Sequence, residues 1–259
     1  MKKNEAKSKS SLQSVTNALR VLKLFNETDT YLGISEISRR MKIGKSTAYR
    51  LVSTLLNEGF LEQDKENSKY YLGIELLHIG HLVQKRINCL KDAHLYLESL
   101  ASEVGQTVHL VVLNNDHAMF IDKVQGSNLI NMRSSIGMSM PAYKTASGKV
   151  LLSHKSDEEL NEYIHSVKLT ASTEHTITDP AKLEEVIRKA RTDGYAMDNE
   201  ESEEGLSCVS VPLYGFHKQP VAAISISGLT NKIVNNLPEY IDSLKNISAE
   251  ISKKIGYIE

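Results

Sequence analysis

The chain has 259 residues, and its 31 lysines and arginines against 32 aspartates and glutamates give a net charge of -1 at neutral pH. This length allows one large or two modest domains, each able to bury its own hydrophobic core. The charge is unevenly spread, because residues 1–73 hold 13 basic against 8 acidic side chains, whereas residues 74–259 hold 18 against 24. A basic amino-terminal part beside an acidic remainder is expected if only the first part contacts nucleic-acid phosphates.

Cysteine content and hydropathy exclude several classes of protein. Cys89 and Cys208 are the only cysteines, and their separation excludes a disulfide framework or a zinc finger. No apolar run approaches the roughly 18 residues that a membrane-spanning helix needs. Residues 1–10 are lysine-rich but lack the apolar segment of a signal peptide, so we expect a flexible basic arm. The sequence therefore predicts a soluble, cytoplasmic protein.

Residues 11–73 are predicted to form a DNA-binding domain that begins with a helix over residues 14–25. Two short amphipathic helices are predicted next, over residues 33–41 and 45–58, with a tight turn between them. Gly44 is expected to give that turn a backbone angle that side chains resist. The buried face of the first helix is expected to comprise Val15, Ala18, Leu19, Leu22 and Phe25.

The helix over residues 45–58 carries small hydroxyls, an aromatic ring and two cations on the face that its apolar stripe leaves outward. Such side chains suit hydrogen bonding to phosphates and base edges when a helix lies in the major groove of DNA. Residues 61–64 and 69–72 flank a polar turn and predict the two strands of a wing. A small helical core with a hairpin and no ligand is the alternative that this pattern leaves open. The expected DNA-binding residues are Lys45, Ser46, Thr47, Tyr49, Arg50 and Ser53.

Residues 74–91 are predicted to form a connecting helix that joins two domains and helps to pair two subunits. Residues 92–259 are expected to form an α+β domain in which an antiparallel sheet carries helices. Its strands are expected over residues 107–113, 118–124, 128–133, 207–213 and 221–227. Its helices are expected over residues 93–104, 145–153, 157–165, 180–192 and 238–255.

Two serines indicate a binding site in the second domain. Ser225 and Ser227 point to one face of a predicted strand that is otherwise apolar. Hydroxyls at these positions suit a polar cavity that holds a small acid or carbonyl compound. Hydrogen bonding of both hydroxyls within the fold is the alternative, and from spacing alone the two interpretations are about equally supported.

Catalytic signatures are weak throughout the chain. It has no His-Glu-x-x-His motif, no phosphate-binding glycine loop and no Gly-x-Ser-x-Gly elbow. An enzyme with Cys208 as nucleophile and His109 as base is the rival hypothesis, disfavoured because nothing in the sequence positions the base and an oxyanion site. The acidic run over residues 200–204 is expected to be a solvated loop, and no metal site or cofactor is expected.

Short stretches in a characteristic order carry a resemblance along nearly the whole chain. In the amino-terminal part they are residues 14–22, 45–51 and 70–73. In the remainder they are residues 105–110, 145–149, 194–198, 200–201, 205–208 and 223–228. Together these stretches resemble the IclR family of bacterial transcription regulators.

The resemblance implies an amino-terminal winged helix-turn-helix, a linker helix, and a carboxy-terminal domain for effector binding and oligomerisation that is related to the GAF fold. It also implies a homodimer or dimer of dimers that binds double-stranded DNA, commonly as a repressor, and that responds to a small-molecule effector. One helix covers a half-site, so we expect a palindromic operator. The effector-binding residues implied are Leu129, Met132, Ala146, Ser147, Gly148, Asp198, Cys208, Ser225 and Ser227.

Overall fold

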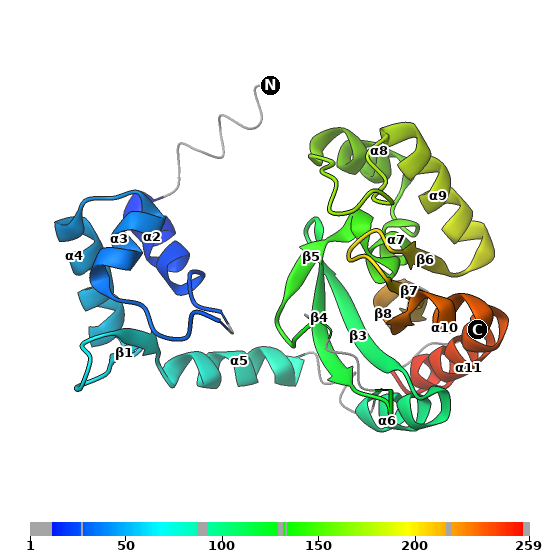
Figure 1. The fold of residues 1–259 in the computed structure, drawn as a ribbon, viewed down its shortest axis with the longest axis horizontal. Coiled ribbons are helices and arrows are strands. Elements are labelled where there is room, and N and C mark those ends of the chain that lie inside the picture. The colour runs from blue at the N-terminus through cyan, green and yellow to red at the C-terminus, as the bar shows by residue number, and fades with distance from the viewer. Residues whose placement is uncertain are drawn as a thin grey trace. The chain divides into compact units, whose positions relative to one another are not determined.

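The computed structural model describes residues 12–26, 28–86, 93–128, 132, 134–215 and 219–255, so the expected basic arm lies outside the described residues. The chain divides into two compact units, residues 1–87 and 88–259 (Figure 1). In the described part of the chain, no helix is both long and apolar enough to cross a membrane.

The first unit is built on helices α2 (Gln13–Leu22), α3 (Ile34–Met41) and α4 (Lys45–Asn57). Their shared core contains Val21, Ile37 and Val52, each with no exposed surface. The helices expected over residues 33–41 and 45–58 are therefore present within a residue or two at their ends.

The buried face of α2 differs from the predicted one. Val15 and Leu19 are 51% and 54% exposed, whereas Val21 is fully buried and Phe25 is 9% exposed. Ala18 and Leu22 pack against the core as expected. The prediction was wrong at Val15 and Leu19 because the helix turns residues 18, 21 and 22 toward the core, a stripe rotated from the expected one, and the helix ends at Leu22, before Phe25.

The turn between α3 and α4 also departs from expectation. Lys42, with φ of 53°, takes the left-handed conformation, whereas Gly44 is extended with φ of -61° and precedes the first turn of α4. Gly59, which ends α4, has φ of 75°. A Cβ atom on Gly73 would lie 2.1 Å from the carbonyl oxygen of Gly59, so these two backbones touch directly.

The wing is a two-stranded antiparallel sheet of β1 (Leu61–Gln63) and β2 (Tyr70–Leu72). Leu32 extends it by a bridge to Tyr70, which joins the wing to the segment before α3. Helix α5 (Glu75–Arg86) follows, in the place expected for the connecting helix.

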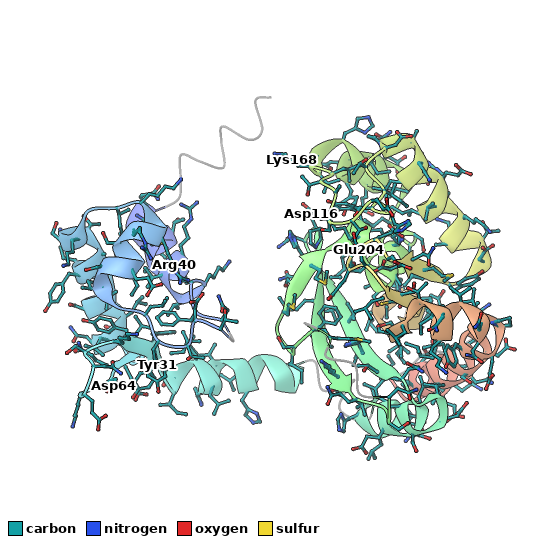
Figure 2. All side chains as sticks on the ribbon, viewed as in Figure 1. Tyr31, Arg40, Asp64, Asp116, Lys168 and Glu204 are labelled. Atoms are coloured by element: carbon teal, nitrogen blue, oxygen red, sulfur yellow. The ribbon has the colours of Figure 1, made fainter. Side chains whose placement is uncertain are left out.

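Arg40, labelled in Figure 2, makes charged contacts that stabilise the start of the helix-turn-helix. The guanidinium of Arg40 on α3 donates to both carboxylate oxygens of Asp29, at 2.7 and 2.9 Å. It also donates to Glu36 one turn earlier, at 2.5 Å. The loop before α3 is thereby fixed to the helix, and the pKa of Asp29 is lowered to about 2 chiefly by its hydrogen bond to Arg40.

The second unit contains a six-stranded antiparallel sheet in the order β5-β4-β3-β8-β7-β6. Four of its strands confirm predicted ones. The bounds are β3 (Thr107–Asn114), β4 (His117–Val124), β5 (Ser139–Pro141), β6 (Ala196–Asn199), β7 (Leu206–Tyr214) and β8 (Pro220–Leu229).

The edge strands are the ones that differ from the prediction. Of the residues in the strand expected over 128–133, only Asn128 and Met132 are described, and both lie outside any strand. The strand beside β4 is instead β5, which is only three residues long and ends in a proline. Neither β5 nor β6 is long enough to show a clear alternation in the sequence.

Several helices pack against this sheet, and others pack against those helices. Helix α7 (Ala146–Leu152) contacts strands β3, β6, β7 and β8, and α9 (Pro180–Asp193) packs against α7. Figure 1 shows α8 (Asp157–Ser166) beside α9, and α6 (Ala93–Val104) beside α11 (Leu237–Lys254). Helix α10 (Thr230–Asn235) directly follows β8.

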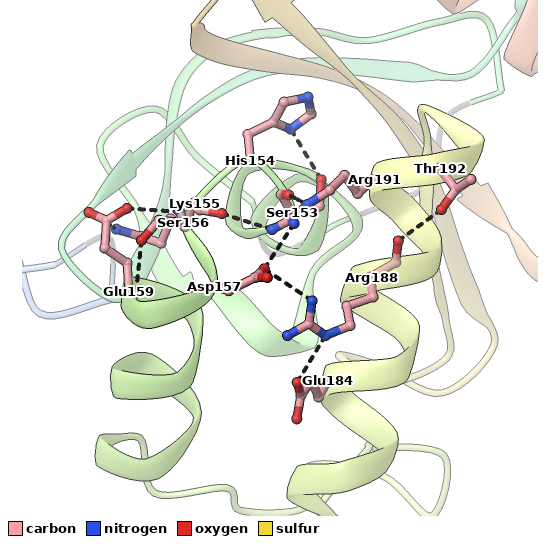
Figure 3. Close-up of polar contacts among 10 residues, drawn as sticks. All are labelled: Ser153, His154, Lys155, Ser156, Asp157, Glu159, Glu184, Arg188, Arg191 and Thr192. Atoms are coloured by element: carbon pink, nitrogen blue, oxygen red, sulfur yellow. Dashed lines mark hydrogen bonds and ion pairs between the residues drawn. The ribbon is translucent and has the colours of Figure 1, made fainter.

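The end of α7 is tied to α8 and α9 by one acidic residue and two arginines (Figure 3). The carboxylate of Asp157 accepts from Arg188 and from Arg191, each at 3.0 Å. Arg191 also donates to the carbonyl oxygens of Ser153 and Lys155, at 2.5 and 2.8 Å. These bonds satisfy carbonyl groups that the end of α7 leaves without intrahelical partners and so fix the helix over the sheet.

Candidate functional site

Helix α4 presents the expected DNA-binding side chains to solvent, because Ala48, Val52 and Leu55 on its opposite face are buried. Its N-cap is Gly44, and no side chain caps the amides of its first turn. Those amides are therefore available to an anion such as a phosphate. The exposed residues are Lys45, Ser46, Thr47, Tyr49 and Arg50, while Ser53 is half-buried.

Positive charge near α4 comes from the helix-turn-helix more than from the wing. Lys42 is exposed, and the side chain of Arg39 is 78% exposed. In the wing, two lysines are outnumbered by three acidic residues. Phosphate contacts are thus expected around α3 and α4. The wing residues concerned are Glu62, Asp64, Lys65, Glu66 and Lys69.

A cavity of about 270 Å³ lies between the sheet of the second unit and the first turn of α7. A dry protein cavity of roughly 150 Å³ holds benzene, so this volume suits a small metabolite. The expected effector residues that line it are Met132, Ala146, Ser147, Asp198, Cys208, Ser225 and Ser227.

Among the expected effector residues that the structure describes, Gly148 does not line the cavity. A Cβ atom on Gly148 would lie 2.1 Å from the carbonyl oxygen of Ala142, so this glycine permits close packing of α7 against the preceding residues. The prediction for Leu129 falls outside the described residues.

Strand register explains why distant residues meet at the cavity. Asp198 on β6 is opposite Cys208 on β7, and Cys208 is opposite Ser227 on β8. Residues directly opposite in antiparallel strands share a face of the sheet. One row of side chains across three strands therefore places a carboxyl, a thiol and a hydroxyl side by side. In the next row, Ser225 is opposite His109 on β3.

His109 is a cavity residue that sequence reasoning considered only as a catalytic base. Its side chain is 2% exposed, with Nε2 2.8 Å from Ser134 Oγ and Nδ1 3.3 Å from Ser227 Oγ. Its ring lies 5.0 Å from that of Phe120. Burial, helped by the nearby charge of Lys123, lowers the pKa of His109 to about 3, so the imidazole is neutral. No local sequence signal indicates this role, because it follows from the register of position 109 with Ser225 on β8.

A buried ion pair fixes the cavity wall beside Asp198. Lys149 on α7 has no exposed surface and donates to Glu201, which is 6% exposed. The backbone amides of Glu201 and Ser202 donate to Asp198 Oδ1 at 2.7 and 3.3 Å. Burial raises the pKa of both Asp198 and Glu201. The expectation of a solvated acidic loop was therefore wrong at Glu201, and the lone lysine in the apolar sequence of α7 was the missed signal.

Models of known families match both units. Residues 81–253 match the bacterial transcriptional regulator IclR C-terminal domain, and residues 14–65 match the IclR helix-turn-helix domain. The chain belongs to the IclR family. It is thus a transcription regulator with an amino-terminal helix-turn-helix and a carboxy-terminal α+β domain, as expected.

Individual relatives cover nearly the full chain. The HTH-type transcriptional regulator XynR of Escherichia coli strain K12 is 36% identical over 247 residues, which cover 95% of this chain and 98% of XynR. The transcriptional repressor IclR of the same strain is 32% identical, over 87% of this chain and 83% of that protein. The crystal structure of the Thermotoga maritima IclR matches with a TM-score of 0.74 and 36% identity, over 95% of this chain and 100% of that one.

Membership of the IclR family also decides against the rival enzyme hypothesis. Burial raises the pKa of the Cys208 thiol to about 12, so the thiol is protonated and a poor nucleophile. The imidazole of His109 bonds to Ser134 and Ser227. Within the described residues, no group of three histidine, cysteine or acidic side chains is arranged to hold a metal ion.

Proposed function

We propose that this IclR-family regulator is a repressor that reads a palindromic operator with α4 and releases it when an effector occupies the cavity. The DNA-binding proposal is supported by the exposed face at the start of α4, which carries Thr47, Arg50 and the 59% exposed Tyr49. Repression is supported by the similarity of the chain to the transcriptional repressor IclR of Escherichia coli. Since the target is chromosomal DNA, we also infer a cytoplasmic location.

The cavity is the single observation that carries the effector proposal. Ser225 and Ser227 are 3% and 4% exposed and line a space of about 270 Å³. Ala146 and Ser147 also line it, and amides in the first turn of a helix lack intrahelical acceptors. These groups suit the oxygen atoms of a small organic acid or carbonyl compound, with Asp198 and Cys208 beside them.

A second copy of the chain is the expected partner in DNA binding. Two recognition helices read two half-sites about one helical turn apart, whereas one helix covers a single half-site. Leu77 and Leu82 on α5 are 68% and 53% exposed in the single chain. Apolar side chains at this exposure support a homodimer formed through the connecting helix, alone or within a dimer of dimers.

The decisive experiment compares operator release by wild type and by the double variant Ser225→Ala with Ser227→Ala. The variant should bind operator without effector as wild type does and should no longer respond to effector, because a ligand shifts operator affinity only through its own differential binding. Effectors are taken from a panel of small organic acids, and release is measured by fluorescence anisotropy of labelled operator.

A matched control removes two buried hydroxyls outside the cavity. Ser207 bonds to Asn199 and Thr230, and Ser248 bonds to the carbonyl oxygen of Pro212. The variant Ser207→Ala with Ser248→Ala should respond to effector as wild type does. A normal response in the cavity variant would place the effector site elsewhere.

A further inference from the structure

The cavity changes character across the strand order of the sheet. On β5 and β4 the cavity is lined by the apolar side chains of Met140, Ala118 and Phe120. On β8, β7 and β6 it is polar, from Ser227, Cys208 and Asp198, with Leu206 as an apolar exception. The boundary between the two ends falls on β3, the strand between β4 and β8.

His109 stands at this boundary and contacts both ends. The face of its strand continues with Val111, which is opposite Phe120 in the register of β3 and β4. The imidazole lies 5.0 Å from the Phe120 ring on the carbon side. On the polar side its Nδ1 is 3.3 Å from Ser227 Oγ. A ligand that fills both ends therefore passes across the edge of this imidazole.

The two hydrogen bonds of His109 differ in length. The contact of Nε2 with Ser134 is 2.8 Å, within the usual range, whereas the contact of Nδ1 with Ser227 is 3.3 Å and therefore weaker. A neutral imidazole has one donor nitrogen and one acceptor nitrogen. A ligand hydroxyl both donates and accepts, so it can replace Ser227 at Nδ1 in either tautomer. A carboxylate only accepts and lacks this freedom.

We propose that His109 is a specificity-determining residue that selects a hydroxylated organic acid with an apolar body. The body lies against Phe120 and Val111, and the hydroxyl lies at His109 Nδ1 beside Ser227. This inference rests on the proposed effector site. The hydroxyls of Ser147 and Ser225, which line the cavity, are the groups proposed to donate to the carboxylate.

The test uses matched pairs of acids that differ only by one hydroxyl. The pairs are mandelate with phenylacetate, and 2-hydroxyisocaproate with isocaproate, and gluconate serves as a fully hydroxylated comparator. Binding to the full chain is measured by isothermal titration calorimetry at pH 7. For wild type, each hydroxylated member should bind about tenfold more tightly than its partner, the effect of one well-placed hydrogen bond.

Two substitutions at position 109 separate hydrogen bonding from shape. His109→Phe keeps a ring and removes both nitrogens, so the ratio of the two dissociation constants should fall to near one. His109→Asn keeps a donor and an acceptor, so part of the ratio should be retained. Circular dichroism and thermal unfolding establish that each variant is folded, and His109→Leu, which also lacks both nitrogens, replaces His109→Phe should that variant fail to fold.

Several outcomes overturn the inference. They are equal binding of the paired acids by wild type, tightest binding of gluconate, binding of none of the probes, and an unchanged ratio in folded His109→Phe. The variant Ser225→Ala with Ser227→Ala distinguishes this failure from failure of the proposed site. If that variant no longer binds the probes while His109→Phe keeps the ratio of dissociation constants, the proposed cavity site is supported and the role of His109 is contradicted. If it binds the probes as wild type does, the site itself is wrong.

Discussion

The polar groups of α4 and those of the cavity are similar in chemistry but opposite in environment. On α4, Tyr49 is 59% exposed and Arg50 also faces solvent. In the cavity, His109 and Ser227 are 2% and 4% exposed and bond to each other. Solvated side chains can be replaced with little effect on the fold, whereas buried polar groups must keep their partners. Substitutions on α4 should therefore report on DNA binding alone, and substitutions near the cavity on binding and stability together.

The largest effect is expected at the buried ion pair. Lys149→Met leaves the carboxylate of Glu201 buried without its partner and should lower the free energy of unfolding by about 3–5 kcal/mol. Replacing both residues, Lys149→Met with Glu201→Leu, should recover most of the loss, because two apolar side chains need no partner. Urea unfolding at pH 7 measures both variants.

An exposed pair provides the control for this comparison. Lys189 on α9 donates to Asp193 at 2.8 Å, and its side chain is 69% exposed. Lys189→Met should leave the unfolding midpoint unchanged, because solvent screens such a pair. If Lys149→Met destabilises the chain no more than Lys189→Met does, the predicted difference between the buried and the exposed ion pair is wrong.

On the exposed side of the comparison, Arg50→Ala should weaken operator binding by about 1–3 kcal/mol if its guanidinium reads a base. The combined substitution of Thr47, Tyr49 and Arg50 by alanine should abolish specific binding while the unfolding midpoint stays close to that of wild type. Gel-shift titration at fixed salt measures the affinity, and Glu58→Ala, just beyond the far end of α4, is the control. Unchanged affinity in the triple variant would contradict the assignment of α4.

Local chemistry made the framework of both units predictable from sequence. Helix α9 begins as expected, because Asp179 caps it and Pro180 occupies its first turn. Strand β8 was predicted from its alternation, and the cavity face of Ser225 and Ser227 follows from the same two-residue period. Motifs read within one element could therefore be placed before the structure was known.

Features that depend on partners far away in sequence were missed. The side chain of Lys149 is buried because it meets Glu201, 52 residues later, and no local pattern encodes that pairing. His109 lines the cavity through its register with β8, more than a hundred residues away. The rotation of α2 was likewise set by its packing against the core and not by its own apolar spacing.

Acid pH should lower the free energy of unfolding, because His109 stays neutral in the folded chain. Its pKa is about 3 in the folded chain against 6.5 for an unperturbed histidine, so the unfolded chain binds more protons between these values. The free energy of unfolding therefore falls as pH drops through this window, and at pH 5 the penalty from His109 is about 2 kcal/mol. When the pH is lowered from 7 to 5, the free energy of unfolding of His109→Gln should therefore increase by about that much relative to that of wild type, as measured by urea unfolding.

The comparison with wild type isolates His109 from the other buried groups. Asp198 and Glu201 have raised pKa values and act in the opposite sense, but they do so in both proteins and cancel in the difference. His117 lies exposed on the neighbouring strand β4, and His117→Gln serves as the control. An equal response of the two glutamine variants to pH would show that burial does not hold His109 neutral.

The smallest effect on the fold is expected on α5, where apolar side chains are exposed like the polar ones of α4. Leu77 and Leu82 are 68% and 53% exposed, so replacing each by serine should change the stability of one chain by less than about 0.5 kcal/mol. If the two side chains contact a second copy, the same variant should halve the mass measured by light scattering at micromolar concentration and weaken operator binding. His78→Ser with His81→Ser changes exposed polar residues of the same helix and should leave the mass unchanged. A dimer that survives the leucine substitutions would mean that these apolar side chains have no partner in assembly and that pairing uses another surface.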